Sequence, residues 1–409
     1  MDAIEERKLA DWITSYMEYT EESEPPKLFR EWCAVSVIAA ALQRKCWLEW
    51  GTTTFYPNLY IVLTAPAGKA RKGTAMAPAR KFIDKMGIPC AAEAVTREAL
   101  IRTLKEAEDV TPMRNNMPPA IHSSLTVFSP ELTVFLGYNN VQLMSDLTDW
   151  FDCSSKWTYR TKTAGTDDIT GVYLNLIGAT TPDLIRSTLP LDAIGGGLTS
   201  RIIFVFEERK GKIVPFPFFS AEMRRLEEAL YYDIEKIHML QGRYKVTKSF
   251  LEKWGDWYTS QEGVSPFKHN PTRAFDGYIE RRPTQVLKLS MVMNASRCSD
   301  MNLDLCDLER AINLLERTEV KMPRAFGGIG MSQNSNLTYR VIEALCNSGG
   351  MTLPELLNHF IYDGSQNEIV TILNSLTTSK LVVSESSKAG VVYKATQLTS
   401  NFGMTKQSN

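Results

Sequence analysis

Residues 58–76 read NLYIVLTAPAGKARKGTAM, a stretch with three distinct parts. Leu59 to Thr64 is a short apolar run with β-branched residues, and it has the length of a buried strand. Residues 65–71 are small and turn-prone. Residues 72–74, Lys-Gly-Thr, then open a segment, Ala75 to Met86, that we predict to be a helix. A strand, a small-residue loop, a lysine, a hydroxyl and a helix in this order predict a phosphate-binding loop.

The chemistry expected of this loop is the binding of ATP together with Mg²⁺. Backbone N–H groups at the start of a helix bind anionic oxygens, and the helix dipole adds to the attraction. We expect Lys72 to place its charge beside the phosphates and Thr74 to ligate Mg²⁺ through its hydroxyl. The predicted nucleotide contacts of the loop are Ala67, Gly68, Lys69, Arg71, Lys72, Gly73 and Thr74.

The match to the strict Gly-Lys-Ser/Thr pattern is incomplete. Arg71 stands where the second glycine is expected, and the hydroxyl follows one residue late, after Gly73. The charge of the stretch still fits an anion site, since residues 66–85 hold six Lys or Arg and one Asp. The alternative interpretation is a basic surface loop between a strand and a helix.

Composition sets limits on the protein class. The 409 residues are enough for two or three domains, and 44% hydrophobic with 23% charged residues is ordinary for a soluble protein. The formal net charge is −1, so a nucleic-acid-binding surface would have to be local. No apolar run approaches the roughly 18 residues of a membrane span, and the N-terminus lacks the apolar core of a signal peptide. Seven scattered cysteines predict reduced thiols in the cytoplasm and no zinc site. The lack of a long apolar run predicts no membrane partner.

A second buried strand is predicted at Ser124 to Phe128, followed by Ser129, Pro130 and Glu131. In ATPases with a phosphate loop, a nearby strand ends in acidic residues, one of which polarises the attacking water. Glu131 is placed for that role, whereas Ser129 and Pro130 occupy the position of the metal-binding acid. The alternative for Glu131 is an acid at a helix N-terminus, which the helix dipole favours.

Residues 156–173 predict a β-hairpin with a basic face. Four residues alternate toward that face: Lys156, Thr158, Arg160 and Lys162. Such a face could follow a phosphodiester backbone, with Trp157 and Tyr159 available for stacking on bases. An ordinary solvated hairpin is the alternative.

Two later stretches supply polar residues at strand ends. Val172 to Ile177 is predicted as a third buried strand, and Thr180 or Thr181 after it could sense the γ-phosphate or cap the next helix. Residues 195–201 read GGGLTSR ahead of another apolar strand. This loop could present Arg201 to a phosphate, because a guanidinium is permanently charged and bidentate. If ATP lies between subunits, Arg201 acts in the site of the neighbour.

The remainder of the chain is predicted to be mainly helical. Residues 213–326 begin with a linker and continue as several helices, and residues 327–336 form a flexible linker. Residues 335–400 then show three helices and a strand pair, the order of a winged-helix-like domain. This domain carries four Lys or Arg against five acids, so a protein contact or a lid role is as plausible as DNA binding.

Together these motifs resemble a family of P-loop ATPases carried by phages and mobile elements, the helicase part of primase–helicase proteins. The similarity spans about residues 25–320. Its landmarks are YPNLYIVLTAPAG with RKGTA, VFSPELTVFL, KWTYRTK, YLNLIGATTPDLI, GGGLTSRIIFVF and RPTQVLKLSMVM. The resemblance implies an α/β fold with a P-loop NTPase core of the RecA/AAA+-like type at 51–212. A helical cap at 1–50, a helical subdomain at 213–326 and the winged-helix-like domain at 335–400 complete it.

The resemblance also implies roles for individual residues. Lys72 and Thr74 would lie at the phosphates and Mg²⁺, and Glu131 would be the acidic catalyst. Thr181 or its neighbour would be the sensor, and Arg201 would act across subunits. The family carries Arg-Lys at the end of its phosphate loop, which accounts for Arg71.

The hairpin lies where superfamily-3 and related hexameric helicases carry their pore hairpin. The resemblance therefore implies DNA contacts by Lys156, Arg160 and Lys162. The family's Asp before the catalytic Glu is Pro130 in this chain.

We therefore expect an ATP-driven DNA helicase or translocase that acts in phage or mobile-element replication. It would form a ring, expected to be a hexamer, with ATP between subunits and single-stranded or forked DNA in the pore. A primase or polymerase would be a separate partner chain. Two alternatives stay open: a non-motor ATPase switch that loads a helicase or binds an origin, and a small-molecule kinase suggested by Lys-Gly-Thr.

Overall fold

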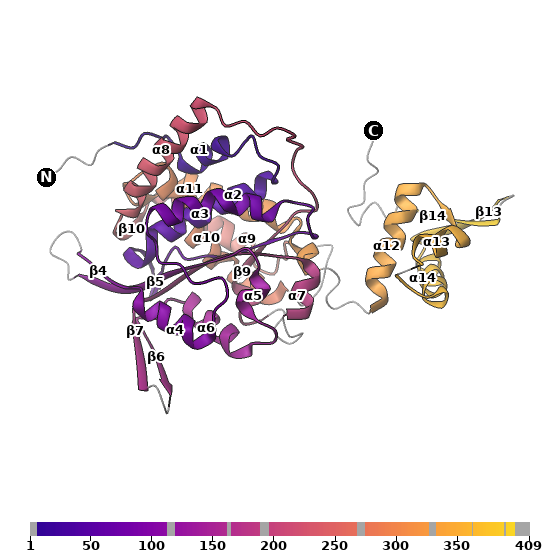
Figure 1. The fold of residues 1–409 in the computed structure, drawn as a ribbon, viewed down its shortest axis with the longest axis horizontal. Coiled ribbons are helices and arrows are strands. Elements are labelled where there is room, and N and C mark those ends of the chain that lie inside the picture. Colours follow the sequence, from indigo (N-terminus) through magenta and orange to yellow (C-terminus); the bar gives the residue numbers. More distant parts are fainter. Residues whose placement is uncertain are drawn as a thin grey trace. The chain divides into compact units, whose positions relative to one another are not determined.

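The structure is a computed structural model. It describes residues 6–112, 119–161, 165–188, 196–267, 275–326, 333–361, 363–387 and 390–396. The described residues form two compact units, one that ends at Phe326 and one that begins at Gln333 (Figure 1). Both contain helices and strands, so the predicted α/β class is confirmed. Within the described ranges, no helix has the length and apolar character needed to cross a bilayer.

A five-stranded sheet forms the centre of the first unit, in the order β4-β5-β8-β3-β9. Its strands are β4 (Glu108–Thr111), β5 (Ala120–Ser129), β8 (Val172–Thr180), β3 (Tyr60–Thr64) and β9 (Ile202–Phe206). The last four are parallel, and β4 pairs antiparallel at one edge. Every residue of β3, β8 and β9 is buried, as expected for strands covered on both faces.

Four strands end at the same edge of this sheet. Thr64 of β3 is in register with Thr180 of β8 and with Phe206 of β9, and Ser129 of β5 is in register with Gly178. Strand β8 therefore lies between β3 and β5. The loops that follow these strands open outside their carboxyl ends, which is where open α/β sheets bind ligands.

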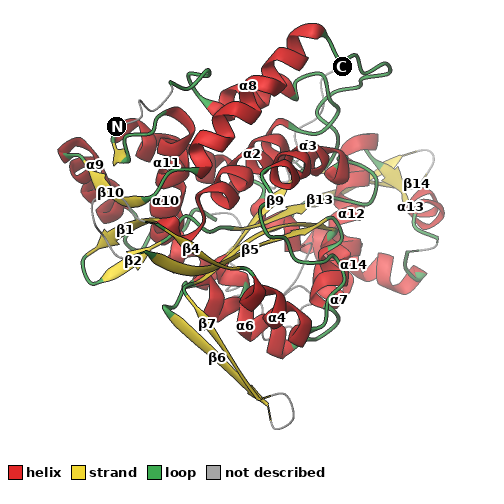
Figure 2. Ribbon diagram, turned by 60° about the vertical axis from the view of Figure 1, so that its left-hand side comes forward, coloured by secondary structure: helices red, strands yellow, loops and turns green. Residues whose placement is uncertain are grey.

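Helices cover both faces of the sheet (Figures 1 and 2). One face carries α1 (Trp12–Tyr19), α2 (Lys27–Leu42), α3 (Lys72–Lys85) and α8 (Ala221–His238). The other carries α4 (Arg97–Glu106), α5 (Leu132–Leu136), α6 (Val141–Phe151) and α7 (Pro182–Thr188). Almost all of α2 is buried, because it contacts the sheet as well as α1, α3, α8 and α10. Its nearly uniform apolar sequence is typical of such a core helix.

A second, small sheet lies beside three helices of the first unit. Its order is β11-β10-β1-β2, with β11 (Asn302–Leu303), β10 (Gly242–Val246), β1 (Cys46–Trp50) and β2 (Thr53–Phe55). The helices next to it are α9 (Lys248–Ser260), α10 (Asp276–Arg297) and α11 (Leu305–Glu319). The prediction of a helical region up to residue 50 is wrong for β1. This aromatic-rich segment pairs with β10, a partner distant in the sequence, and tertiary pairing overrides local preference.

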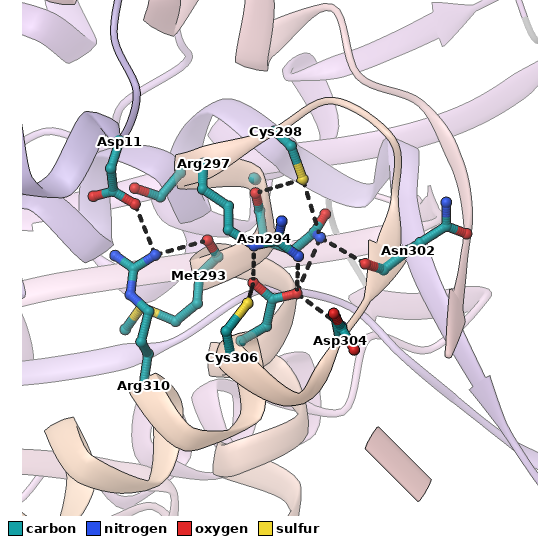
Figure 3. A network of polar contacts seen from close by, with 12 residues as sticks. Asp11, Met293, Asn294, Arg297, Cys298, Asn302, Asp304, Cys306 and Arg310 are labelled. Atoms are coloured by element: carbon teal, nitrogen blue, oxygen red, sulfur yellow. Dashed lines mark hydrogen bonds and ion pairs between the residues drawn. The ribbon is translucent and has the colours of Figure 1, made fainter. Parts of the chain in front are cut away.

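A polar network joins α10, α11 and the N-terminal segment (Figure 3). Arg297 donates two hydrogen bonds to Asp307, at 2.6 and 2.8 Å, and the Asn294 amide donates a third at 3.1 Å. Arg310 donates to Asp11 at 2.7 Å. The Asp307 carboxylate is fully buried, and it is stable there because its oxygens are paired.

The second unit has its own apolar core. It contains α12 (Gln333–Ser348), α13 (Leu353–His359), α14 (Gln366–Thr378), and the antiparallel strands β12 (Met351–Thr352), β13 (Val382–Ser387) and β14 (Gly390–Ala395). Its core includes Val341, Leu356 and Leu373, each at most 1% exposed. Helices α13 and α14 both begin with a capping box, in which a hydroxyl and a glutamate satisfy orphan N–H groups. Helix α12 begins inside the predicted 327–336 linker, of which residues 327–332 lie outside the described residues.

His122 of β5 links the stability of the first unit to pH. Its side chain is buried, and its ring nitrogens lie 3.1 Å from the Thr111 hydroxyl and 3.0 Å from the Ser124 hydroxyl. Burial lowers the pKa of His122 from 6.5 to about 4. Above pH 6.5 the imidazole is neutral in both the folded and the unfolded chain. Between pH 6.5 and about 4 only the unfolded chain takes up the proton, so stability falls as the pH falls.

We expect His122→Gln to flatten the loss of stability between pH 7 and pH 4.5, by at most about 3 kcal/mol over the full titration. Urea unfolding at several pH values measures this loss. His359→Gln, at an exposed histidine of the second unit, is the control for replacing a histidine by glutamine. If His122→Gln and the wild-type protein lose the same stability between pH 7 and pH 4.5, other groups are responsible for that loss.

Candidate functional site

Residues 65–71 form the loop that connects β3 to α3 at the carboxyl edge of the sheet. Ala67, Gly68 and Lys69 are exposed at its crest. Gly68 has a φ of +70°, in the left-handed region that glycine enters without a side-chain penalty. Arg71 also adopts this region, with φ 55° and ψ 43°, and it turns the chain directly into α3. The predicted sequence of strand, loop and helix is present at this position.

The first turn of α3 leaves its backbone donors open. No side chain caps the helix, and the first helical bond is donated by Ala75 N to Arg71 O at 3.0 Å. The N–H groups of residues 72–74 precede that bond and have no intrahelical acceptor. Gly73 is exposed, and a side chain there would meet no atom within 4 Å. Thr74 is exposed beside it, so an anion has free access to these donors.

Lys72 reaches back across the loop. Its ammonium donates to the carbonyl of Ala65 at 2.9 Å. Burial lowers the pKa of Lys72, and the charge of Glu131 acts against this shift. The structure thus brings Lys72 and Glu131 into the same electrostatic environment, although they are far apart in the sequence.

Glu131 follows β5 directly and precedes α5. Its carboxylate is exposed and makes no capping hydrogen bond to the helix. The position at a helix start agrees with the alternative interpretation of this residue. The free carboxylate near Lys72 is what a water-activating base requires.

Two hydroxyls at this edge are buried without a partner in the described residues. Ser129 Oγ and Thr180 Oγ1 belong to side chains that are 1% and 2% exposed, and neither makes a hydrogen bond. They lie at the ends of the neighbouring strands β5 and β8. A buried hydroxyl left unpaired costs about 1–3 kcal/mol, so such a group usually meets water or a ligand.

Thr181 and Thr180 differ in their contacts. The Thr181 hydroxyl accepts a hydrogen bond from Leu184 N at 3.3 Å and caps α7. Thr180 is the one whose hydroxyl is unpartnered at the strand end. The sequence predicted either residue as a sensor of the γ-phosphate. The unpartnered hydroxyl of Thr180 fits that prediction better than the Thr181 hydroxyl, which caps α7.

Arg201 lies at the opposite edge of the sheet from the β3–α3 loop. It ends the short 3₁₀ helix Thr199–Arg201, and Ile202 next to it is in register with Tyr60 at the start of β3. A strand of this length separates the two edges by about 15 Å. Arg201 is buried and donates to Asp152 at 2.6 Å and to the carbonyl of Gly197 at 3.0 Å. The fold therefore does not bring Arg201 to Lys72 within one chain.

The predicted hairpin is present as β6 (Lys156–Thr161) and β7 (Gly165–Thr170), and it projects away from the sheet (Figures 1 and 2). Lys156 and Arg160 are exposed on it, whereas Lys162 lies outside the described residues. Lys156 forms an ion pair with Asp168 of β7 at 3.0 Å. The basic face is thus partly neutralised by an acid on the returning strand, where Asp168 is in register with Thr158 and diagonal to Lys156.

The aromatic residues of the hairpin pack inward. Trp157 stacks on Tyr159 with ring centroids 6.2 Å apart and meets Trp150 edge-on. The guanidinium of Arg97 lies 4.8 Å from the centre of the Tyr159 ring. Both hairpin rings are half-buried, so they anchor the hairpin and are only partly available to bases.

Glu24 was missed by sequence reasoning. Its carboxylate accepts hydrogen bonds from Arg71 at 2.8 Å and from Lys210 at 2.5 Å, and the N–H of Lys210 donates to Lys69 O at 2.9 Å. These two cations hold the pKa of Glu24 at about 2. Glu24 therefore fixes the β3–α3 loop to the segment that follows β9. The three parts are far apart in the sequence, so no local signal could have shown this contact.

No cluster of three His, Cys, Asp or Glu side chains suited to a metal occurs in the ranges that the structure describes. Thr74 is the predicted metal ligand, and its exposed position beside the open first turn of α3 is compatible with that role. Mg²⁺ usually takes few protein ligands and completes its shell with phosphate oxygens and water.

Arg201 should contribute to folding as well as to any reaction. We expect Arg201→Ala to lower the free energy of unfolding by about 2 kcal/mol, because it leaves the Gly197 carbonyl without its donor. Urea unfolding measures this loss. Arg317→Ala is the control, since the Arg317 side chain, which pairs with Glu31, is 42% exposed against 9% for Arg201, and it should contribute less than about 1 kcal/mol. Equal losses in the two variants would contradict the structural contribution of Arg201.

No protein-family model matches the chain, and no curated protein matches it at a significant level. The resemblance to primase–helicase ATPases therefore stays a prediction from the motifs. Any functional assignment depends on the residues and contacts described above.

Proposed function

We propose that this chain is an ATP-dependent DNA helicase or translocase with a P-loop NTPase core of the RecA/AAA+-like type. The observation that carries this proposal is the open first turn of α3, which follows β3 at the carboxyl edge of the sheet. Lys72 is drawn across the loop there, and the Glu131 charge acts on it. A triphosphate bound at this position would meet donors, a lysine and a carboxylate in the arrangement that hydrolysis requires.

In the proposed mechanism the N–H groups of residues 72–74 hold the β-phosphate. The Lys72 ammonium exchanges its bond to Ala65 O for a γ-phosphate oxygen and neutralises charge as it develops. Glu131 accepts a hydrogen bond from the attacking water and orients it. Mg²⁺, held through Thr74, would neutralise the phosphate oxygens. The unpaired hydroxyls of Ser129 and Thr180 are suited to position water at the strand ends.

The position of Arg201 supports an assembly in which ATP lies between copies. Arg201 is about one strand length away from the phosphate loop of its own chain. If Arg201 contacts a nucleotide, that nucleotide would belong to a neighbouring copy, as in a ring, which we propose to be a hexamer. The hairpin would then contact single-stranded or forked DNA in the pore through Lys156 and Arg160.

The second unit is proposed to be winged-helix-like, on the basis of its three helices and its β13–β14 pair. Arg340 pairs with Asp363 and Lys394 with Glu385, so part of its positive charge is already neutralised. A contact with a partner protein, such as a separate primase or polymerase, suits this balance as well as DNA does.

A non-motor ATPase switch is the second candidate, and one observation favours it. Ser129 ends β5 where a metal-binding acid is expected, and a hydroxyl holds a cation more weakly than a carboxylate does. Slow hydrolysis would suit a helicase loader or an origin-binding protein.

We expect Lys72→Ala to reduce ATP hydrolysis about a hundredfold or more, because charge on the γ-phosphate is no longer neutralised. The steady-state rate, with and without single-stranded DNA, is the measurement. Lys81→Ala is the matched control, since Lys81 lies exposed on the same helix. Retained turnover in Lys72→Ala would mean that the nucleotide site lies elsewhere.

The same assay separates the two candidates. Hydrolysis stimulated by single-stranded DNA, together with strand separation, is expected of the motor. Nucleotide binding without unwinding would support the switch.

The hairpin yields a second expected outcome. Lys156→Ala combined with Arg160→Ala should weaken single-stranded DNA binding and reduce the slope of log K against log[salt] by about 1.4, because two phosphate contacts are lost. Fluorescence anisotropy at several salt concentrations measures both quantities. Asp168→Asn should have the opposite effect on affinity, since it frees Lys156 from its ion pair.

Lys248→Ala is the control for this pair. Lys248 is a highly exposed lysine on α9, away from the hairpin, and its removal should leave the slope unchanged. An unchanged slope in the double variant would rule out the hairpin as a DNA contact.

A further inference from the structure

A pocket of about 250 Å³ lies beside Asp152, the carboxylate that also binds Arg201. Residues of β2 and the turn after it form one wall, and α10 forms the other. Arg281, Thr284 and Lys288 of α10 line the pocket, and their spacing of three and four residues places them on one face of the helix. Tyr56 lines the opposite wall. The pocket is thus separate from the phosphate loop and adjoins the opposite edge of the sheet.

The charges around this pocket are unbalanced. Asp152 accepts from Arg201 at 2.6 Å and lies 3.5 Å from a nitrogen of Arg281. Lys288 donates to the Asn58 amide oxygen at 2.6 Å and to the Phe151 carbonyl at 3.2 Å, both of them neutral groups. Asp152 thus pairs with two of these three cations, and Lys288 pairs with no carboxylate of the described residues, so the four charged groups have a net charge of +2.

Lys288 is the most exceptional of the three. Its side chain is 3% exposed, and its ammonium lies 3.9 Å from the centre of the Phe151 ring. Burial lowers the pKa of Lys288 to about 8, Asp152 acts against this shift, and Arg201 and Arg281 add to it by repulsion. A buried lysine without a carboxylate partner is unfavourable for folding, and such groups concentrate at functional sites.

We propose that this pocket binds a phosphate-bearing anion through Arg281 and Lys288. A guanidinium offers two parallel donors to a phosphate, and the ammonium adds a point charge. The hydroxyls of Thr53 and Thr284 also line the pocket and can donate to further oxygens. The volume accommodates a phosphate or pyrophosphate group, and binding neutralises the surplus charge.

The phosphate can come from two sources. One is free phosphate, pyrophosphate or a free nucleotide. The other is the nucleotide bound at the phosphate loop of a second copy of this chain, and this source rests on the proposed function. Arg201 shares Asp152 with the pocket, so a second copy that approaches Arg201 would also approach Arg281.

The first experiment uses the full chain with Lys72→Ala, so that the phosphate loop contributes little. Pyrophosphate is titrated by calorimetry, and the thermal midpoint is followed in parallel. We expect measurable binding, and we expect Arg281→Gln on this background to weaken it about tenfold or more. Arg243→Gln is the matched control, because Arg243 is exposed and pairs with Glu49 outside the pocket.

Asp152→Asn gives a test in the opposite direction. It removes the one carboxylate at nearly constant volume, so the affinity for pyrophosphate should rise severalfold. This variant keeps the proposal testable if Arg281→Gln fails to fold. Neither variant depends on ATP hydrolysis, so failure of the proposed ATPase activity leaves this outcome unaffected.

The second experiment addresses the other source. Tagged Lys72→Ala copies are mixed with wild-type copies loaded with a non-hydrolysable ATP analogue, and the associated fraction is measured. The phosphate belongs to a neighbouring copy if two results are obtained together. Arg281→Gln in the tagged copies abolishes the association, and the first experiment detects no pyrophosphate binding. Pyrophosphate binding that depends on Arg281 assigns it to free phosphate. If neither Arg281→Gln nor Asp152→Asn changes either measurement, the proposal is overturned.

Discussion

Four parallel strands of the central sheet end at one edge, because β3 is in register with both β8 and β9. Helices cover both faces of this sheet, so its apolar strands have no surface left for a polar ligand (Figure 1). Polar chemistry is confined to the two edges where the strands begin and end. At the carboxyl edge lie the open first turn of α3, the Glu131 carboxylate and the two unpaired hydroxyls. The register of the strands therefore determines which side chains lie at the same edge of the sheet and can contact one ligand.

The amino edge carries a different set of charges. Arg201 and Arg281 share Asp152 there, and Lys288 is buried beside them without a carboxylate of its own. A β-strand of five residues keeps these cations about 15 Å from Lys72, and the buried sheet does not bend to close that gap. If both edges act on one phosphate, the cations must therefore come from another copy. If they act separately, the two proposed anion sites would have different surroundings.

Local sequence patterns correctly predicted those strands whose formation depends on residues close together in the sequence. The apolar run before Thr64 becomes β3, and the alternation after Lys156 becomes the hairpin, because each pattern is decided within a few residues. The contacts of Glu24 and Asp152 could not be predicted in this way, since their partners are brought to them only by the packing of the whole unit. Strand β1 could not be predicted locally either, because it pairs with β10, which is distant in the sequence.

The ion pairs Lys156–Asp168 and Arg201–Asp152 differ in the free energy needed to replace the carboxylate by another anion. Lys156 and Asp168 are both largely exposed, so solvent screens their attraction and a DNA phosphate can replace the carboxylate with little loss. Arg201 is buried, and its donation to Gly197 O helps to fix the segment before β9. Releasing it from Asp152 requires a new anion at the same place, because a buried unpaired guanidinium is unfavourable. Under the proposed function, the hairpin would therefore bind and release a DNA strand repeatedly, whereas the cations of the amino edge would respond only to the arrival of another negative group.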